Sequence, residues 1–260
     1  MAERGGNTPR VFLVGAGPGD PGLLTVRAAE LLAAADVVFH DALVPGAILA
    51  VAPSAEMVPV GRRAGQERRE TAGVADAMAA RAAAGEVVVR LKGGDPYLFG
   101  RGGEEGAALL ERGVAFEVVP GVSSALAAPA AAGIPLTHRG VASSVTIVTG
   151  HVADAAGDVR WERLAGGADT LVVLMGGARL RQLSRALVLA GRPASTPAAV
   201  VMAATRPEQR HVVATLETIA DAAEHAAMGT PAVLVVGEVV RLSEVLLSAA
   251  VADLAEASAG

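Results

Sequence analysis

Short β-branched apolar runs alternate with helical segments along the first half of this chain, and this rhythm constrains the fold more than any other feature. The run at 11–14 precedes a glycine-rich loop and then a helix that Thr25 can cap. Strands that alternate with helices predict a mostly parallel sheet with right-handed crossovers. Pro59 should confine its strand to a sheet edge, because proline cannot donate to a ladder. The further strands expected in this half lie at 36–41, 56–60, 87–91 and 114–119.

A second group of strand-like runs follows residue 139. Helical segments separate some of these runs, and the run at 209–215 is expected to pair antiparallel at a hairpin. The other expected strands lie at 145–148, 171–174, 198–201 and 233–236. We therefore predict two α/β domains, a mostly parallel one at 10–138 and a mixed one at 139–245, followed by a C-terminal tail at 246–260.

The composition excludes several classes of function. No cysteine occurs in the 260 residues, which rules out disulfides, thiolate metal sites and thiol nucleophiles and is typical of a reducing compartment, so we expect a cytoplasmic protein. The net charge is −5 and only 2% of the residues are aromatic. Because neither general phosphate binding nor base stacking has support in this composition, we expect no nucleic-acid partner.

Although 52% of the residues are hydrophobic, no segment has the pattern of a membrane span. The longest stretch without charge, 118–137, is interrupted by Pro120, Pro129 and Pro135. A spanning helix needs about 20 apolar residues with few breaks. The residues before Val11 contain no apolar stretch typical of a secretory signal, so neither export nor a membrane partner is expected.

Three loops at the predicted carboxyl ends of strands are the candidate ligand sites: 15–22, 92–105 and 120–124. The first resembles a dinucleotide fingerprint, but Asp20 takes the place of its last glycine. Pro18 and Pro21 also remove amide donors that a pyrophosphate would need. A lysine-containing phosphate loop is absent, since no Gly-Lys-Ser/Thr occurs. Taken alone, the first loop is equally consistent with a tight turn.

Several motifs in a fixed order are more specific than any one loop. Together they resemble the tetrapyrrole methylases over residues 10–245, with the long motif at 90–105 and Pro-Leu-Thr-His-Arg at 135–139 as the most specific parts. The other motifs are Gly-Ala-Gly-Pro-Gly-Asp-Pro-Gly-Leu-Leu-Thr at 15–25, Asp-Ala-Leu-Val at 41–44, Gly-Arg-Arg-Ala-Gly at 61–65, Pro-Gly-Val-Ser-Ser at 120–124 and Thr-Gly-His at 149–151.

The likeness is greatest to the family members that act on uroporphyrinogen III. It implies transfer of two methyl groups from S-adenosyl-L-methionine to ring carbons, giving precorrin-2 for sirohaem or cobalamin synthesis and S-adenosyl-L-homocysteine as by-product. An electron-rich pyrrole carbon is already a nucleophile, so the enzyme must mainly align the reactants and exclude water. Neither a metal ion nor a covalent intermediate is required.

The resemblance assigns cofactor-binding roles to residues of both predicted domains. Ser124 and Ala204 depart from the alanine and glycine that are commoner at these places in the family. Met175, without the resemblance, is better explained as core filler at a strand end. The full implied set is Pro18, Gly93, Gly94, Asp95, Leu98, Ser123, Ser124, Met175 and Ala204.

The resemblance also implies a proton acceptor, Asp41, at the carboxyl end of a strand. Its alternative reading is a helix cap or turn residue. Arg62 stands where the family commonly has a lysine regarded as a proton donor. Because a guanidinium is effectively never deprotonated, Arg62 suits anion binding better than proton transfer.

The implied substrate is a polycarboxylate, whereas the chain is itself acidic at −5, so a local basic wall must recruit it. Arginine can pair with carboxylates through two hydrogen bonds, which suits this task. Each basic residue taken singly could equally be an ordinary solvated charge. The candidate substrate-binding residues are Arg62, Arg63, Lys92, Arg101, His138 and Arg139.

Three other functions remain open from the sequence. Another corrin-pathway methylase, such as one that acts on precorrin-2, would share the fold and cofactor. A nucleotide-binding regulator would use the same glycine loops, and a nicotinamide oxidoreductase would place Asp41 on a ribose. The family suggests a homodimer. Because only about ten residues precede the first strand, we expect a stand-alone enzyme without a fused dehydrogenase and chelatase module.

Overall fold

The computed structural model describes residues 10–60, 71–150 and 161–246. It divides into two compact units, Met1–Ser123 and Ser124–Gly260. Both units are α/β, as the alternation of strands and helices predicts.

The sheet of the first unit has five parallel strands in the order β3-β2-β4-β1-β5. The predicted parallel arrangement is therefore confirmed, and Pro59 lies on the edge strand, where its missing N–H costs no ladder bond. The strands are β1 (Val11–Gly15), β2 (Val37–His40), β3 (Glu56–Pro59), β4 (Val88–Lys92) and β5 (Phe116–Val119).

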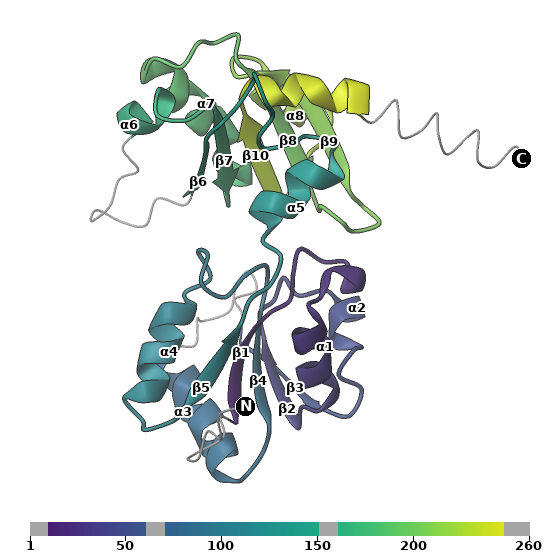
Figure 1. Cartoon of the computed structure of the whole chain (residues 1–260), viewed down its shortest axis with the longest axis vertical. Helices are drawn as coiled ribbons and strands as arrows, with labels where there is room; N and C mark the ends of the chain where they lie inside the picture. Colours follow the sequence, from purple (N-terminus) through teal and green to yellow (C-terminus); the bar gives the residue numbers. More distant parts are fainter. Residues whose placement is uncertain (1–9, 61–70, 151–160, 247–260) are drawn as a thin grey trace, which may run out of the picture. The chain divides into compact units, whose positions relative to one another are not determined.

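Helices cover both faces of this sheet (Figure 1). On one face lie α1 (Val26–Ala33) and α2 (Gly46–Leu49), and on the other lie α3 (Thr71–Ala83) and α4 (Gly102–Leu110). The Thr25 hydroxyl caps α1 by accepting the N–H of Ala28 at 3.1 Å, which confirms the predicted helix start. The short α2 has no counterpart in the sequence prediction, because four residues are too few to show a helical period.

Alternation along β4 divides its side chains between the two helical layers. Val89 and Leu91 belong to the core cluster under α1, whereas Val88 belongs to the cluster on the α3 and α4 side. Since successive strand residues point to opposite faces, Arg90 and Lys92 share the face of Val88. Two cations are thus placed on an otherwise apolar face.

The crossovers leave the centre of this sheet in opposite directions. From β1 the chain passes through α1 to β2, and from β4 it passes through α4 to β5 on the other side of β1. Because β1 and β4 are neighbours, their carboxyl ends form a topological switch point. Crevices at such points are where open α/β sheets bind ligands.

The sheet of the second unit is mixed, with the order β6-β7-β10-β8-β9. Strands β6 and β7 are parallel, while β10 is antiparallel to both of its neighbours and β9 pairs antiparallel with β8, which confirms the predicted hairpin. The strands are β6 (Val145–Thr149), β7 (Thr170–Leu174), β8 (Pro197–Met202), β9 (Arg210–Thr215) and β10 (Ala232–Val236).

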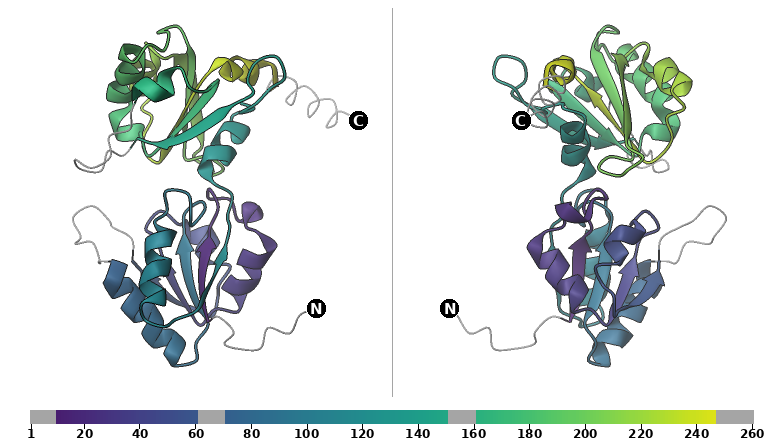
Figure 2. Two further views of the ribbon diagram at one scale, coloured as in Figure 1. Left: turned by 60° about the vertical axis from the view of Figure 1, so that its left-hand side comes forward. Right: turned by 90° about the vertical axis from the view of Figure 1, so that its right-hand side faces the viewer.

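The second sheet is also covered on both faces (Figure 2). Side chains of α7 (Leu180–Leu189) and α8 (Ile219–His225) form a core cluster with β7, β8 and β10, and α6 (Trp161–Ala165) packs beside α7. The alanine-rich α5 (Ser124–Ala131) lies on the opposite face.

The boundary between the units differs from the one expected at residue 138. It falls between Ser123 and Ser124, because α5 packs against β7, β8 and β10 of the second sheet. Gln209 also donates its side-chain amide to the carbonyl of Ala131 at 3.0 Å. The helix is apolar around most of its circumference, so its sequence does not show which sheet it covers.

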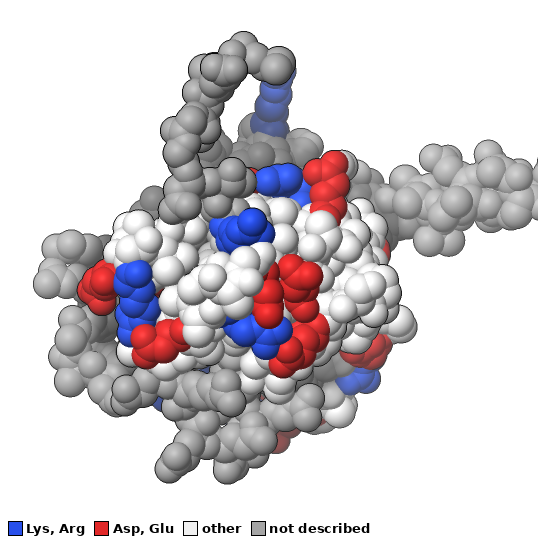
Figure 3. All heavy atoms as spheres, turned by 90° about the horizontal axis from the view of Figure 1, so that it is seen from below, with Lys and Arg blue, Asp and Glu red and all other residues white. Residues whose placement is uncertain are grey.

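Charged side chains of both signs are interspersed on the described part of the face shown in Figure 3, which carries no continuous basic surface. Within the described ranges, no helix is both long enough and apolar enough to cross a membrane. The C-terminal tail expected at 246–260 lies, beyond its first residue, outside the described residues.

Candidate active site

The three candidate loops of the first unit, at 15–22, 92–105 and 120–124, meet at the switch point and pack backbone against backbone. Ala16 donates its N–H to the carbonyl of Lys92 at 2.7 Å, and Gly17 and Gly94 exchange two hydrogen bonds of 3.2 and 2.8 Å. A Cβ on Gly15 would lie 2.5 Å from the nitrogen of Gly121 and 2.6 Å from the carbonyl oxygen of Gly94. No side chain fits there, so only glycine permits this convergence.

Asp95 joins two of these loops through its carboxylate. One oxygen accepts the N–H of Tyr97 at 2.8 Å, and the other accepts the N–H of Gly121 at 3.1 Å. The side chain therefore holds the loop after β4 against the loop after β5. Asp95 was predicted as a cofactor ligand, and in this structure it positions the backbone of the predicted cofactor site.

The other predicted cofactor residues of the first unit lie along the same loops. Gly93 is exposed, and a Cβ added to it would meet no atom within 4 Å. Gly94 has φ of 67°, a left-handed conformation that favours glycine. Pro18 and Leu98 are half-buried, and Ser123 is buried. Open space beside an exposed glycine backbone is what a closely bound ligand requires.

Asp41 directly follows β2 and faces a buried arginine of the neighbouring strand. Arg90 donates from Nη2 to Oδ1 of Asp41 at 2.5 Å. The Arg90 side chain is only 5% exposed, whereas that of Asp41 is 31% exposed. The carboxylate predicted to accept a proton is thus paired with a buried cation and is still partly exposed to solvent.

Glu105 of α4 completes this buried group of charges. Its Oε1 accepts from Nε and Nη2 of Arg90 at 3.1 and 2.9 Å, and its Oε2 accepts from Nζ of Lys92 at 2.8 Å. Arg90 and Glu105 were not among the predicted site residues. The available signal was the pair of cations two residues apart in an otherwise apolar strand, because buried cations on one face need a carboxylate partner.

Lys92 differs from its expected place among exposed substrate-binding cations. It is 2% exposed and its ammonium is paired with Glu105, so it lies in the interior of the first unit rather than on a basic wall. Arg101 is exposed as expected and pairs with Glu104 at 3.1 Å. Burial acts to raise the pKa of Glu104, but hydrogen bonds from Arg101 and from a backbone N–H outweigh it and hold this pKa below its usual value. Arg62 and Arg63 lie outside the described residues.

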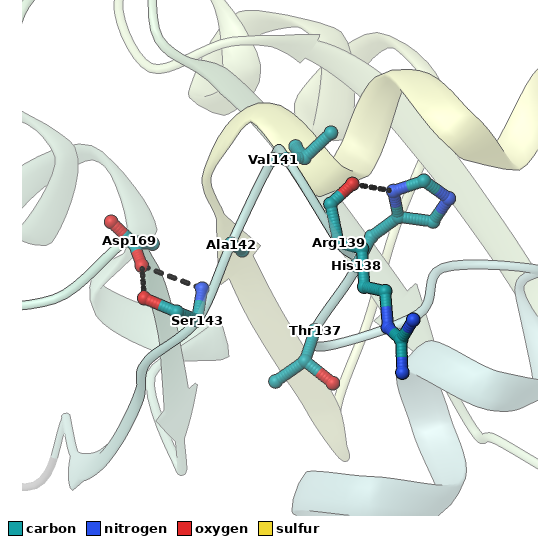
Figure 4. Close-up of a pocket in the computed structure, with 8 residues that line it drawn as sticks. Thr137, His138, Arg139, Val141, Ala142, Ser143 and Asp169 are labelled. Carbon is teal, nitrogen blue, oxygen red and sulfur yellow. Dashed lines mark hydrogen bonds between the residues drawn. The ribbon is translucent and has the colours of Figure 1, made fainter.

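In the second unit, His138 and Arg139 line a surface hollow of about 500 Å³ (Figure 4). Both residues are exposed, and their side chains point in different directions from a turn in which His138 and Ala142 form an antiparallel bridge. On the far side of the hollow, Asp169 accepts hydrogen bonds from the backbone N–H groups of Ser143 and Ser144 at 2.7 and 3.0 Å. The hollow is therefore lined on one side by His138 and Arg139 and on the other by a hydrogen-bonded carboxylate.

The remaining predicted cofactor residues of this unit follow β7 and β8. Met175 has φ of 58° and is 53% exposed. Ala203, also left-handed at φ of 49°, precedes the buried Ala204. Ser124 begins α5. Strained backbone of this kind persists where packing enforces it, and it is common at ligand sites. The exposure of Met175 argues against its alternative reading as core filler.

These features define a class of α/β protein in which glycine-containing loops meet at the switch point of a parallel sheet and form a candidate ligand site, beside a carboxylate that pairs with a buried arginine. No group of three or more metal-ligating side chains occurs among the residues that the structure describes. The open space at Gly93 allows a ligand to approach the backbone of this loop closely.

The family model for Tetrapyrrole (Corrin/Porphyrin) Methylases matches residues 10–220. The chain belongs to the tetrapyrrole methylase family. It is 46% identical to an S-adenosyl-L-methionine-dependent uroporphyrinogen III methyltransferase of Methanosarcina barkeri, over 93% of this chain and 96% of that protein. It is 47% identical to a uroporphyrinogen-III C-methyltransferase of Synechocystis, over 89% of each chain.

A solved structure shares both the fold and much of the sequence. The uroporphyrin-III C-methyl transferase of Thermus thermophilus, complexed with S-adenosylhomocysteine, is 44% identical with a TM-score of 0.77. The alignment covers 90% of this chain and 99% of that one. The fold class expected from the sequence is confirmed by this likeness together with the two sheets described above.

Proposed function

We propose that the protein is a uroporphyrinogen-III C-methyltransferase, which transfers two methyl groups from S-adenosyl-L-methionine and forms precorrin-2 for sirohaem or cobalamin synthesis. Two relatives of this activity are 46% and 47% identical over about nine-tenths of the chain. The observation that carries the proposal is the convergence of Gly15, Gly94 and Gly121 at the switch point, next to the exposed backbone at Gly93.

The glycine loops of the first unit fit a nucleoside and amino-acid ligand. Open space lies where a side chain at Gly93 would be. Asp95 holds the loop after β4 against the loop after β5. When bound, S-adenosylmethionine supplies an electrophilic sulfonium methyl group. The chain's task is then to hold the two reactants in line and to exclude water, which can supply several kcal/mol of the rate enhancement. All the cofactor contacts, including those to Met175 and Ala204 in the second unit, stay predictions.

Asp41 is proposed to accept the proton that the substrate loses after methylation. Its side chain is 31% exposed and its Oδ1 is already paired with Arg90, which supports Oδ2 as the atom that takes the proton. The ion pair with Arg90 restricts the carboxylate to one orientation. Arg62 is assigned to substrate binding rather than to proton transfer, because a guanidinium does not release its proton near neutral pH.

Basic side chains are proposed to bind the carboxylates of the substrate. Arg101, His138 and Arg139 are exposed in the structure, while the assignments of Arg62 and Arg63 rest on the sequence. At a net charge of −5 the chain does not attract a polyanion at long range, so short-range pairing with these residues must provide the binding. Lys92 is not retained in this set, because Glu105 already neutralises it.

The protein is further proposed to act as a homodimer in the cytoplasm, without a nucleic-acid or membrane partner. The absence of cysteine and the acidic net charge support this placement. Sedimentation of the purified chain at micromolar concentration tests the oligomeric state, for which a species of twice the 25.9 kDa chain mass is expected.

The decisive experiment is incubation with uroporphyrinogen III and S-adenosylmethionine carrying a labelled methyl group. We expect two labelled methyl groups per product molecule. A product with no label would refute the assignment. Labelling only when precorrin-2 is supplied would instead show that the protein is another methylase of the corrin pathway.

A further inference from the structure

Buried charge in the first unit is concentrated at one place. The buried polar or charged residues in the described part of this unit are His40, Arg90, Lys92, Glu105 and Ser123. Three of them form one ion-pair network, and His40 directly precedes Asp41, whose carbonyl oxygen lies 3.1 Å from the imidazole Nδ1. Taking charges out of water costs several kcal/mol per ion unless partners compensate, and apolar residues of similar volume are often equally stable or more stable. Such a network therefore calls for a function.

The guanidinium of Arg90 is fixed by contacts other than the one to Asp41. Its Nη1 donates to the carbonyls of Phe39 and Leu91 at 3.3 and 3.0 Å. Its Nε and Nη2 both donate to Oε1 of Glu105, at 3.1 and 2.9 Å. These four bonds set the plane of the guanidinium, so that the Nη2 group also reaches Asp41. Arg90 consequently presents a donor of fixed direction to the carboxylate.

Glu105 is the centre of the network because it bridges both cations. Its side chain is 9% exposed, and its second oxygen accepts from Lys92 at 2.8 Å. Two cations and two carboxylates are therefore gathered, and their charges balance when all are ionised. Asp41 is the one member with substantial exposure, at 31% against 3% to 9% for the other side chains. The network thus reaches the surface of the site only at Asp41.

We propose that Glu105 is a positioning residue for the reaction: it clamps Arg90, and Arg90 holds Asp41 in the orientation that accepts the substrate proton. Lys92 supplies the second positive charge that keeps the buried set neutral. This inference rests on the proposed function and adds to it a residue that never touches substrate. It predicts that the carboxylate of Glu105 affects the methyl-transfer cycle only through Asp41.

The main test is a double-mutant cycle between Glu105→Gln and Asp41→Asn, with kcat for uroporphyrinogen III methylation as the readout. We expect Glu105→Gln alone to lower kcat by about tenfold or more, since small misplacements of a reacting group can cost up to about a hundredfold. Its dissociation constant for S-adenosylhomocysteine should stay within about twofold of wild type. In the Asp41→Asn background the same change should have no further effect, because coupled residues are not additive.

The control is Asp76→Asn, which removes the carboxylate partner of Arg112 on the surface of the same unit. It makes the same chemical change beside an arginine and should leave kcat unaltered. If Glu105→Gln does not fold, because it leaves an uncompensated buried cation, Lys92→Met with Glu105→Gln restores the charge balance. That double variant should fold and still show the loss of kcat.

Equal losses of kcat in the wild-type and Asp41→Asn backgrounds would overturn the positioning role, as would a folded Glu105→Gln variant with wild-type kcat. A wild-type protein without methylation activity would instead refute the proposed function. In that case the Nε–H resonance of Arg90 decides the inference independently. The chemical shift of this resonance should change when Asp41→Asn is introduced into the wild-type protein and should not change when it is introduced into the Glu105→Gln variant. An equal change in both backgrounds would overturn the inference.

Discussion

At the scale of single residues, the backbone beside the proposed cofactor is the most informative feature. Gly93 has open space at its Cβ position, so Gly93→Ala should not disturb the fold. A methyl group there should occupy ligand space and weaken binding of S-adenosylhomocysteine by at least about tenfold, or roughly 1.4 kcal/mol. Titration calorimetry measures this directly.

The matched control is Gly73→Ala in α3, where an added Cβ also meets no atom within 4 Å. This change should leave the ligand affinity unaltered and stabilise the protein by about 0.5–1 kcal/mol, since glycine is unfavourable inside a helix. If Gly93→Ala also left the affinity for S-adenosylhomocysteine unaltered, the cofactor would not bind beside this loop.

Met175 allows a prediction in which stability and binding change in opposite directions. Its φ of 58° is costly for a residue with a side chain, by about 1–2 kcal/mol. Met175→Gly removes that strain from the folded state. Glycine also raises the conformational entropy of the unfolded chain, which lowers the unfolding free energy by about 0.4–1 kcal/mol, so a small net gain in unfolding free energy is expected. If the side chain contacts the cofactor, affinity should fall at the same time. Denaturant unfolding and calorimetry test the two effects, and a fall in stability would argue against strain at this residue.

Arg62 is a sequence-based prediction, since it lies outside the described residues. As a carboxylate anchor, it should tolerate Arg62→Lys with much of its activity retained. Arg62→Ala should weaken use of the substrate by roughly 1.5–3 kcal/mol, the range for hydrogen bonds to charged groups, with cofactor affinity unchanged. A lysine variant that is faster than the native enzyme, with a displaced pH optimum, would indicate proton transfer instead.

At the scale of elements, Asp169 connects the segments that lead into β6 and β7. The backbone hydrogen bond from Ser143 is the largest cause that holds the pKa of Asp169 below its usual value, followed by the hydroxyls of Ser143 and Ser144. A carboxyl group with a lowered folded-state pKa stabilises the fold above its unfolded pKa of 3.8, and this contribution is lost as pH falls through the folded value.

Asp169→Asn should therefore lower the unfolding midpoint at pH 7 and have a diminishing effect below about pH 4. Thermal unfolding of both proteins from pH 7 to pH 3 tests this. The two curves should converge in acid, and a constant difference across that range would show that the carboxylate charge is not involved. Because this carboxylate holds Ser143 at the hollow beside His138 and Arg139, a change in substrate KM is also expected.

At the scale of the whole molecule, ligand binding to the folded state should raise its stability by mass action. With S-adenosylhomocysteine at a hundred times its dissociation constant, the gain is about 2.7 kcal/mol. The same concentration of NAD should leave the unfolding midpoint unchanged. A shift with NAD alone would favour the nicotinamide oxidoreductase that the sequence left open, and differential scanning calorimetry distinguishes these outcomes.

The sequence by itself determined the order of the strands, the longer helices of the first unit, the parallel and mixed sheets and the three candidate loops. These features are local, because a period of two or 3.6 residues and a glycine turn are encoded by neighbours in the chain. The edge position of Pro59 and the cap at Thr25 follow for the same reason.

Only the tertiary structure decided which sheet α5 covers and where Lys92 lies. An alanine-rich helix has no distinctive apolar face, so its packing partner is chosen by the strands that surround it. From the sequence, Lys92 is predicted to be a surface cation. Its side chain can instead be buried because Glu105, thirteen residues away on α4, pairs with its ammonium group. A buried charge depends on its partner, and partners brought together by long-range packing leave no local pattern.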